Sequence, residues 1–106
     1  QIAVLDKRYA APVFRQALRD SDPEVRLATI SELGELESPD VAVELLQIAM
    51  GDSDPEVRAE ALSAADDILE GDDQRLWALI EEALNDPSED VRDEAQLMAE
   101  LYEFDG

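Results

Sequence analysis

A seven-residue motif that occurs three times constrains the fold of this chain more than any other feature. Residues 20–26 have the sequence Asp-Ser-Asp-Pro-Glu-Val-Arg, and residues 52–58 repeat it at all seven positions. Residues 86–92 keep the first Asp, an N-capping residue at the third position, an acid at the fifth, and the final Val-Arg. The copies begin 32 and 34 residues apart. A fixed period of about 20–50 residues is typical of a solenoid, in which similar units stack side by side.

Each copy of the motif has the composition of a helix N-terminus. Asp22 and Asp54 suit the N-cap, Pro23 and Pro55 suit the first helical position, and Ser88 takes the cap position in the third copy. The acid that follows favours the positive end of the helix dipole. From the Val of each motif onward, apolar residues recur in steps of three and four, which indicates a helix.

A second helical pattern precedes each motif, with a large apolar residue (Phe14, Leu46 or Ile80) six positions before the first Asp. Each unit is therefore predicted to be a helical hairpin. We expect first helices at about 5–19, 39–51 and 72–85, and second helices at about 22–37, 54–70 and 88–104. The predicted fold is all-α: one α-solenoid over residues 1–106, with about six helices in three antiparallel hairpins at about 5–37, 38–70 and 71–106.

The two ends of the chain differ in this alignment. Residues 1–6 take the place of the end of an upstream second helix, so the chain is either excised from a longer solenoid or these residues extend the first helix. At the other end, Asp93, Glu94 and Glu100 fit the polar outer face of a terminal unit.

The motif, written D-x-[DS]-x-x-V-R, is followed by an Ala-rich stripe that includes Ala28, Ala61 and Ala95. With this pattern the chain resembles HEAT-repeat proteins of the short kind found in phycobilisome-lyase-like and related bacterial and archaeal proteins. The resemblance extends from about Tyr9 to Tyr102. It implies an α-solenoid, but it does not indicate one activity, because a fold of this type hosts many roles.

Each motif also pairs an Asp with an Arg six positions later. These residues could form an acid-base pair or an anion site. The resemblance instead implies a structural ladder in which they tie neighbouring units together by hydrogen bonds. Arginine suits this role because its planar fork bonds two acceptors at once. The ladder consists of Asp20, Arg26, Asp52, Arg58, Asp86 and Arg92.

The composition excludes several classes of function. The chain has 28 Asp and Glu against 8 Lys and Arg, a formal net charge of -20, and no His or Cys. This charge opposes binding to nucleic acid and to anionic membranes. Without His and Cys there is no Ser-His-Asp or Cys-His pair and no zinc site of the usual kind. No apolar run approaches the ~18 residues of a spanning helix, so membrane insertion is not expected. No feature indicates a compartment or an oligomeric state.

The carboxylates could themselves form binding or catalytic sites. Asp52-Ser53-Asp54 resembles the start of a calcium loop, but an EF-hand would need Gly and Glu where this chain has Val57 and Ser63. The acids around Gly71 fit a solvated loop better than a cation site. Paired carboxylates can hydrolyse glycosides, yet no other feature supports that chemistry. We therefore predict that the chain is not an enzyme and has no catalytic residue, cofactor or metal site.

The function predicted from these observations is a non-catalytic scaffold or adaptor that presents an acidic surface to a protein partner with a basic surface. Two alternatives stay open: an immunity or inhibitor-type mimic of nucleic-acid charge, and a generic solenoid whose acidity reflects a high-salt host. Residues 1–50 carry a net charge of -4 and residues 51–106 carry -16, which favours binding at one end over adaptation to salt.

A partner-binding patch is expected on the second helices, which line the concave face of solenoids similar to HEAT proteins. Its apolar members lie outside the apolar stripe that starts at the Val of each motif, and its polar members belong mostly to the third unit. The predicted patch contains Leu27, Ile30, Leu62, Asp67, Asp93, Glu94 and Gln96.

Overall fold

The computed structural model describes residues 7–36 and 38–102, with the backbone alone for residues 7–11. Within this part of the chain there are six α-helices and no strand, which confirms the predicted all-α class. Both interpretations of residues 1–6 lie outside the described residues. The helices are α1 (Lys7–Ala17), α2 (Pro23–Leu33), α3 (Pro39–Ala49), α4 (Pro55–Ile68), α5 (Gln74–Leu84) and α6 (Glu89–Leu101).

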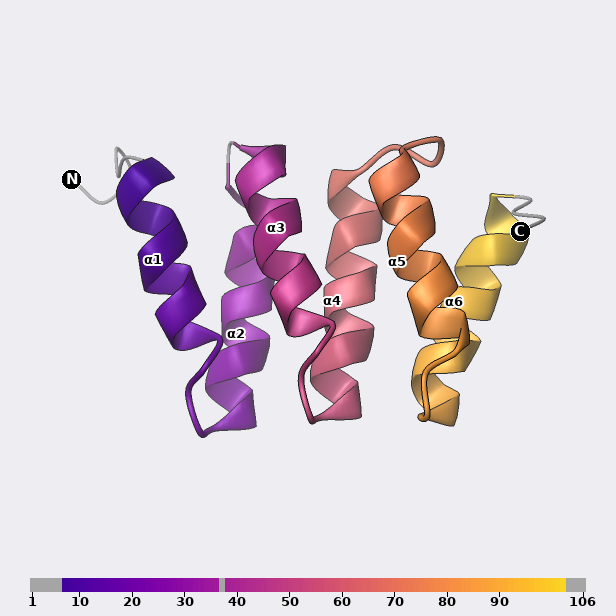
Figure 1. The fold of residues 1–106 in the computed structure, drawn as a ribbon, viewed down its shortest axis with the longest axis horizontal. Coiled ribbons are helices and arrows are strands. Elements are labelled where there is room, and N and C mark those ends of the chain that lie inside the picture. Colours follow the sequence, from indigo (N-terminus) through magenta and orange to yellow (C-terminus); the bar gives the residue numbers. More distant parts are fainter. Residues whose placement is uncertain (1–6, 37, 103–106) are drawn as a thin grey trace.

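The helices form two layers. Helices α1, α3 and α5 make the layer nearer the viewer in Figure 1, and α2, α4 and α6 make the layer behind it. The three hairpins follow one another along the longest of the principal axes, whose extents are 44, 29 and 14 Å. Helix α4 contacts both α2 and α6, so the second helices form a continuous stack. We call this stack the α2–α4–α6 layer.

The helices begin where the motif predicts, because the same Asp residues shape each turn. The carboxylates of Asp20, Asp52 and Asp86 each accept a hydrogen bond from the backbone N–H two residues later, at 2.8–2.9 Å. The next Asp of the first two motifs is the N-cap, and its Oδ1 accepts from the N–H two residues later at 2.9 Å. Ser88 occupies the N-cap of α6 without a side-chain capping bond.

Several helices end earlier than predicted. After Leu33, the N–H groups of Glu35 and Leu36 donate to carbonyls three residues back, at 3.0 and 3.2 Å. These are the bonds of a tight turn rather than of an α-helix, in which the N–H bonds the fourth residue back. The apolar pattern continues through such a turn, because Leu36 still packs against the core. Periodicity alone therefore extends the helix too far.

The core between the two layers is aliphatic. Its largest fully buried side chains are Leu and Ile residues with two valines, and several Ala residues are buried with them. Val57 and Val91, the valines of the second and third motifs, are completely buried, whereas Val25 of the first motif is partly exposed. Because the three positions are equivalent, the burial of Val57 and Val91 reflects the presence of a preceding unit.

A small aromatic cluster fastens the loop before α5 to the end of α6. The rings of Trp77 and Tyr102 meet edge to face, with centroids 6.2 Å apart and an interplanar angle of 73°. The Tyr102 hydroxyl donates a hydrogen bond to Asp66, which raises the pKa of the phenol. Gly71 lies against the ring, and a Cβ at this position would be 2.7 Å from Cδ1 of Tyr102. A larger residue than glycine would displace the ring.

Candidate functional site

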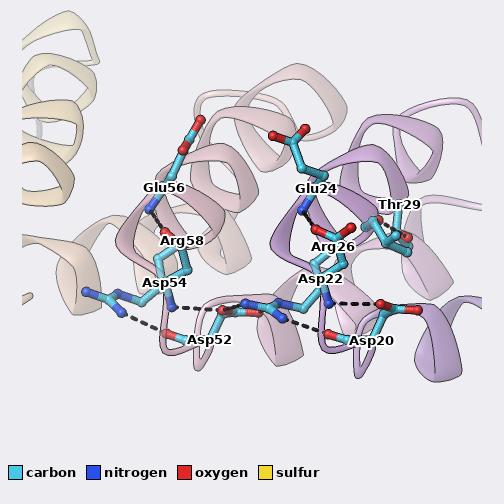
Figure 2. Close-up of polar contacts among 10 residues, drawn as sticks. Asp20, Asp22, Glu24, Arg26, Thr29, Asp52, Asp54, Glu56 and Arg58 are labelled. Carbon is cyan, nitrogen blue, oxygen red and sulfur yellow. Dashed lines mark hydrogen bonds and ion pairs between the residues drawn. The ribbon is translucent and has the colours of Figure 1, made fainter.

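The Asp and Arg residues of the three motifs lie in a row along the turns that precede α2, α4 and α6. In the first step of this ladder, Arg26 Nη1 donates to the Asp20 carbonyl at 2.6 Å, which closes its own turn. Figure 2 shows the same guanidinium reaching the next unit, where its Nε lies 2.8 Å from Asp52 Oδ2. Nη2 donates to Asp52 Oδ1 at 3.2 Å. One arginine therefore joins two units.

The second step has the better geometry. Arg58 Nη1 donates to the Asp52 carbonyl at 2.7 Å, while Nε and Nη2 donate to the two carboxylate oxygens of Asp86 at 2.8 and 2.9 Å. The side chains of Arg58 and Asp86 are only 12% and 8% exposed. The bonds from Arg58 hold the pKa of the Asp86 carboxyl below its usual value, and Asp86 in turn raises the pKa of Arg58.

The ladder is open at the C-terminal end of the described stack. Arg92 Nη1 donates to the Asp86 carbonyl at 2.7 Å, but Arg92 is exposed and forms no ion pair with a described carboxylate. Each Arg thus bonds the backbone of the Asp in its own motif and, where another unit follows, the carboxylate of the next Asp. These are the hydrogen bonds between neighbouring units that the ladder hypothesis implied.

The ladder offers neither a base nor a free arginine donor between units. Guanidinium groups stay protonated and cannot act as bases, and the ladder arginines already donate to carbonyls and carboxylates. A surface hollow between the second and third units is lined in part by Asp52, Arg58 and Asp86, but the Arg58 donors that an anion would use are bonded to the two acids. The described residues contain no group of three or more side chains placed to hold a metal ion.

We predict that Arg58→Ala destabilises the fold more than Arg75→Ala. Removing Arg58 breaks three hydrogen bonds and leaves the Asp86 carboxylate without its ion-pair partner. The expected cost is about 2 kcal/mol, or roughly 10 °C in melting temperature. Arg75 also pairs with Asp40 and Asp73, but its side chain is 41% exposed and solvent screens these contacts.

The measurement is thermal unfolding of both variants, followed by circular dichroism. Equal losses in melting temperature would contradict a special role for the ladder.

A second prediction concerns pH and Asp86→Asn. Because folding lowers the pKa of Asp86, its carboxylate stabilises the folded state above the unfolded-state pKa of about 3.9, and this contribution is lost as pH falls through the lower folded-state value. The melting temperature of the wild type should therefore exceed that of the variant near pH ~6 and approach it near pH ~2. A difference that does not change with pH would show that the carboxylate charge is not responsible.

The apolar part of the predicted partner-binding patch is wrong. Ile30 and Leu62 are buried in the core, with 1% and 0% of their surfaces exposed. The equivalent residue of the third unit, Gln96, is exposed, so we attribute the burial of Ile30 and Leu62 to the second helix that stacks on each of them. Leu27 is half-buried and packs against the same core. None of the three forms an exposed apolar surface.

The polar members of the patch are accessible. Asp67, Asp93 and Gln96 are exposed and Glu94 is half-buried. Gln96 is the equivalent of Ile30 and Leu62 in the third unit, and its side-chain amide donates to Glu100 at 3.2 Å. A polar residue thus replaces the apolar one on the far side of α6. These residues form part of an acidic surface without the apolar centre that was predicted.

Sequence reasoning missed two exposed leucines on α6, Leu97 and Leu101, which are 63% and 70% exposed. The signal was available in the alignment of the units. The equivalents of Leu97 are Ser31 and Ser63, and the equivalents of Leu101 are Glu35 and Asp67. In the third unit, leucines therefore stand where the first two units have polar residues.

The charge divides between the two layers. Helices α1, α3 and α5 contain 4 acidic and 4 basic residues, whereas α2, α4 and α6 contain 11 acidic and 3 basic residues. The 3 basic residues of the α2–α4–α6 layer are the ladder arginines, each bonded to a turn carbonyl. The excess negative charge of the helices therefore belongs to the α2–α4–α6 layer.

None of the described helices is long and apolar enough to cross a membrane.

Comparison with known proteins agrees with this architecture. A search of curated protein sequences gave no match. A family model described as HEAT repeats matches residues 5–99, which is most of the chain. The stacked two-helix units agree with this match, and the chain belongs to the HEAT-repeat family.

Proposed function

We propose that this protein is a non-catalytic interaction scaffold that presents the acidic α2–α4–α6 layer to a protein partner with a basic surface. HEAT repeats are commonly scaffolds for protein interaction. The observation that carries the finer proposal is the charge of the two layers, which is balanced in one and strongly negative in the other. A function unrelated to this surface gives no reason for the difference.

Two of the four acids on the helices of the α1–α3–α5 layer have ion-pair partners, whereas the acids of α6 have none among the described residues. In the α1–α3–α5 layer, Glu44 pairs with Arg15 at 3.7 Å and Asp40 pairs with Arg75 at 2.8 Å. On α6, none of Asp90, Asp93 and Glu94 forms an ion pair with another described residue. Uncompensated charges of one sign create a long-range field, which accelerates encounter with an oppositely charged partner and weakens as salt is added.

The salt dependence of folding separates this proposal from adaptation to a high-salt host. We expect the chain to unfold cooperatively from a helical state at about 0.01 M KCl as well as at about 1 M KCl, conditions in which the Debye length falls from about 30 to about 3 Å. The physical reason is that the buried core and the ladder hold the stack together without screening. A chain that is helical only in molar KCl, by circular dichroism, would favour the high-salt explanation.

The binding proposal is tested by capture of proteins on the immobilised chain and on two charge-matched variants. Asp93→Asn with Glu94→Gln removes two negative charges from α6, and Glu81→Gln with Glu82→Gln removes two from α5. We expect the wild type and the α5 variant to retain a basic protein from extracts of the native organism. The α6 variant should retain less of it, and added salt should release it.

Retained proteins would be identified by mass spectrometry. Failure to retain any basic protein at low salt would overturn the proposed function. Equal retention by both variants would show that the charge of the α2–α4–α6 layer is not responsible.

A further inference from the structure

The exposed leucines of α6 form a continuous apolar strip. Leu97 and Leu101 are four residues apart, so their side chains lie one above the other on the same side of the helix. They are 63% and 70% exposed, more than any other large apolar side chain among the described residues. Two leucines at this spacing are the arrangement by which helices contact a partner helix.

Their exposure is not explained by the position of α6 at the end of the described stack. At the equivalent positions of the first two units, Ser31, Glu35 and Asp67 are exposed and Ser63 is half-buried, although another unit follows each of them. On the second helices, stacking therefore leaves this side exposed at Ser31 and Asp67 and half-buried at Ser63, while Glu35 lies in the turn after α2. A further unit packed on α6 in the same way would leave Leu101 as exposed as Asp67 and would bury Leu97 at most as much as Ser63.

The position that stacking does cover has the opposite pattern. It is occupied by Ile30 and Leu62 in the first two units, which are buried, and by the exposed Gln96 in the third. Helix α6 thus has a polar residue where the repeat buries an apolar one, and apolar residues where the repeat is polar. As a result, the apolar residues of α6 lie on the side that the other units leave exposed, and not on the side that contacts the next second helix.

Acidic side chains continue this side of α6 toward its N-terminus. Asp93 and Glu94 precede Leu97 by four and three residues, and Asp90 precedes Glu94 by four, which places all of them on the side of α6 that carries the leucines. We call these five residues (Asp90, Asp93, Glu94, Leu97 and Leu101) the α6 outer face. It combines an acidic N-terminal part with an apolar C-terminal part, and this combination restricts what can cover it.

We propose that the α6 outer face binds a cationic amphipathic helix of a protein partner, whose apolar side covers Leu97 and Leu101 while its Lys or Arg residues face the acids. This proposal rests on the proposed function and specifies the surface and the partner. A second copy of the chain fits poorly, because its own α6 outer face carries the same three acids and would bring more negative charge to the contact. A cationic helix instead satisfies both parts of the face.

The test uses a synthetic helical peptide of Leu and Lys with its leucines on one side, and measures its affinity for the whole chain by calorimetry. The variant Leu97→Ser with Leu101→Asp installs the residues that α4 has at the same positions, Ser63 and Asp67. We expect this variant to bind the peptide roughly tenfold or more weakly, since the apolar contact is lost. The variant is more negative than the wild type, so attraction of charges alone predicts equal or tighter binding.

The matched control is Ile48→Asp. Ile48 is an apolar residue of α3, is 42% exposed, and lies in the other layer. Its replacement adds the same charge away from the α6 outer face and should leave the affinity unchanged. Melting curves of all variants should stay close to that of the wild type, because the replaced side chains are exposed.

Three results would overturn the proposal: equal or tighter binding by the Leu97→Ser and Leu101→Asp variant, equal binding of a peptide with the same composition but scattered leucines, or no binding of the amphipathic peptide at all. A dimer of the wild-type chain that this variant abolishes, seen by sedimentation, would assign the face to a second copy and also overturn it. None of these results decides whether the acidic layer retains a basic protein, so failure of the α6 face and failure of the proposed function are distinguishable.

Discussion

The contact of Arg58 with both Asp52 and Asp86 is the interaction that fixes how the units of this protein fit together. A two-helix hairpin cannot bury its apolar side alone, so the fold requires each unit to meet the next in a defined register. Apolar packing favours contact but tolerates sliding, whereas the fork of Arg58 matches the two oxygens of Asp86 in one orientation. The same arginine closes the turn of its own unit, which links the shape of the turn to the placement of its neighbour.

Most of the fold was predictable because its signals are local. The capping Asp and the Pro after it specify the start of α2 and α4 within a few residues. The helix ends were less predictable, since Leu36 packs on the core from a turn and looks helical in the apolar pattern. The contacts between units were predictable only as a resemblance, because hydrogen bonds from Arg58 to residues of two units depend on how the hairpins stack.

The partner-binding patch failed for a reason that follows from the architecture. An isolated hairpin buries one stripe of each helix, and residues beside the stripe look exposed. In a solenoid a second helix has another covered side, toward the next second helix, and the burial of Ile30 and Leu62 beside the exposure of Gln96 indicates that they lie there. Comparing units position by position would have identified Gln96 as the end of that side and Leu97 as an apolar residue in a polar position.

These constraints indicate where this protein can carry a function of its own. The ladder residues and the buried positions between units serve the stack, and a change there affects register or stability before it affects a partner. The exposed side of a second helix does not contact the core or another unit, so its residues can differ from unit to unit without a loss of stability. The first two units use it for Ser and acids, and the third uses it for two leucines among acids. The surface most specific to this protein is therefore the exposed side of α6, where its residues differ from those of α2 and α4.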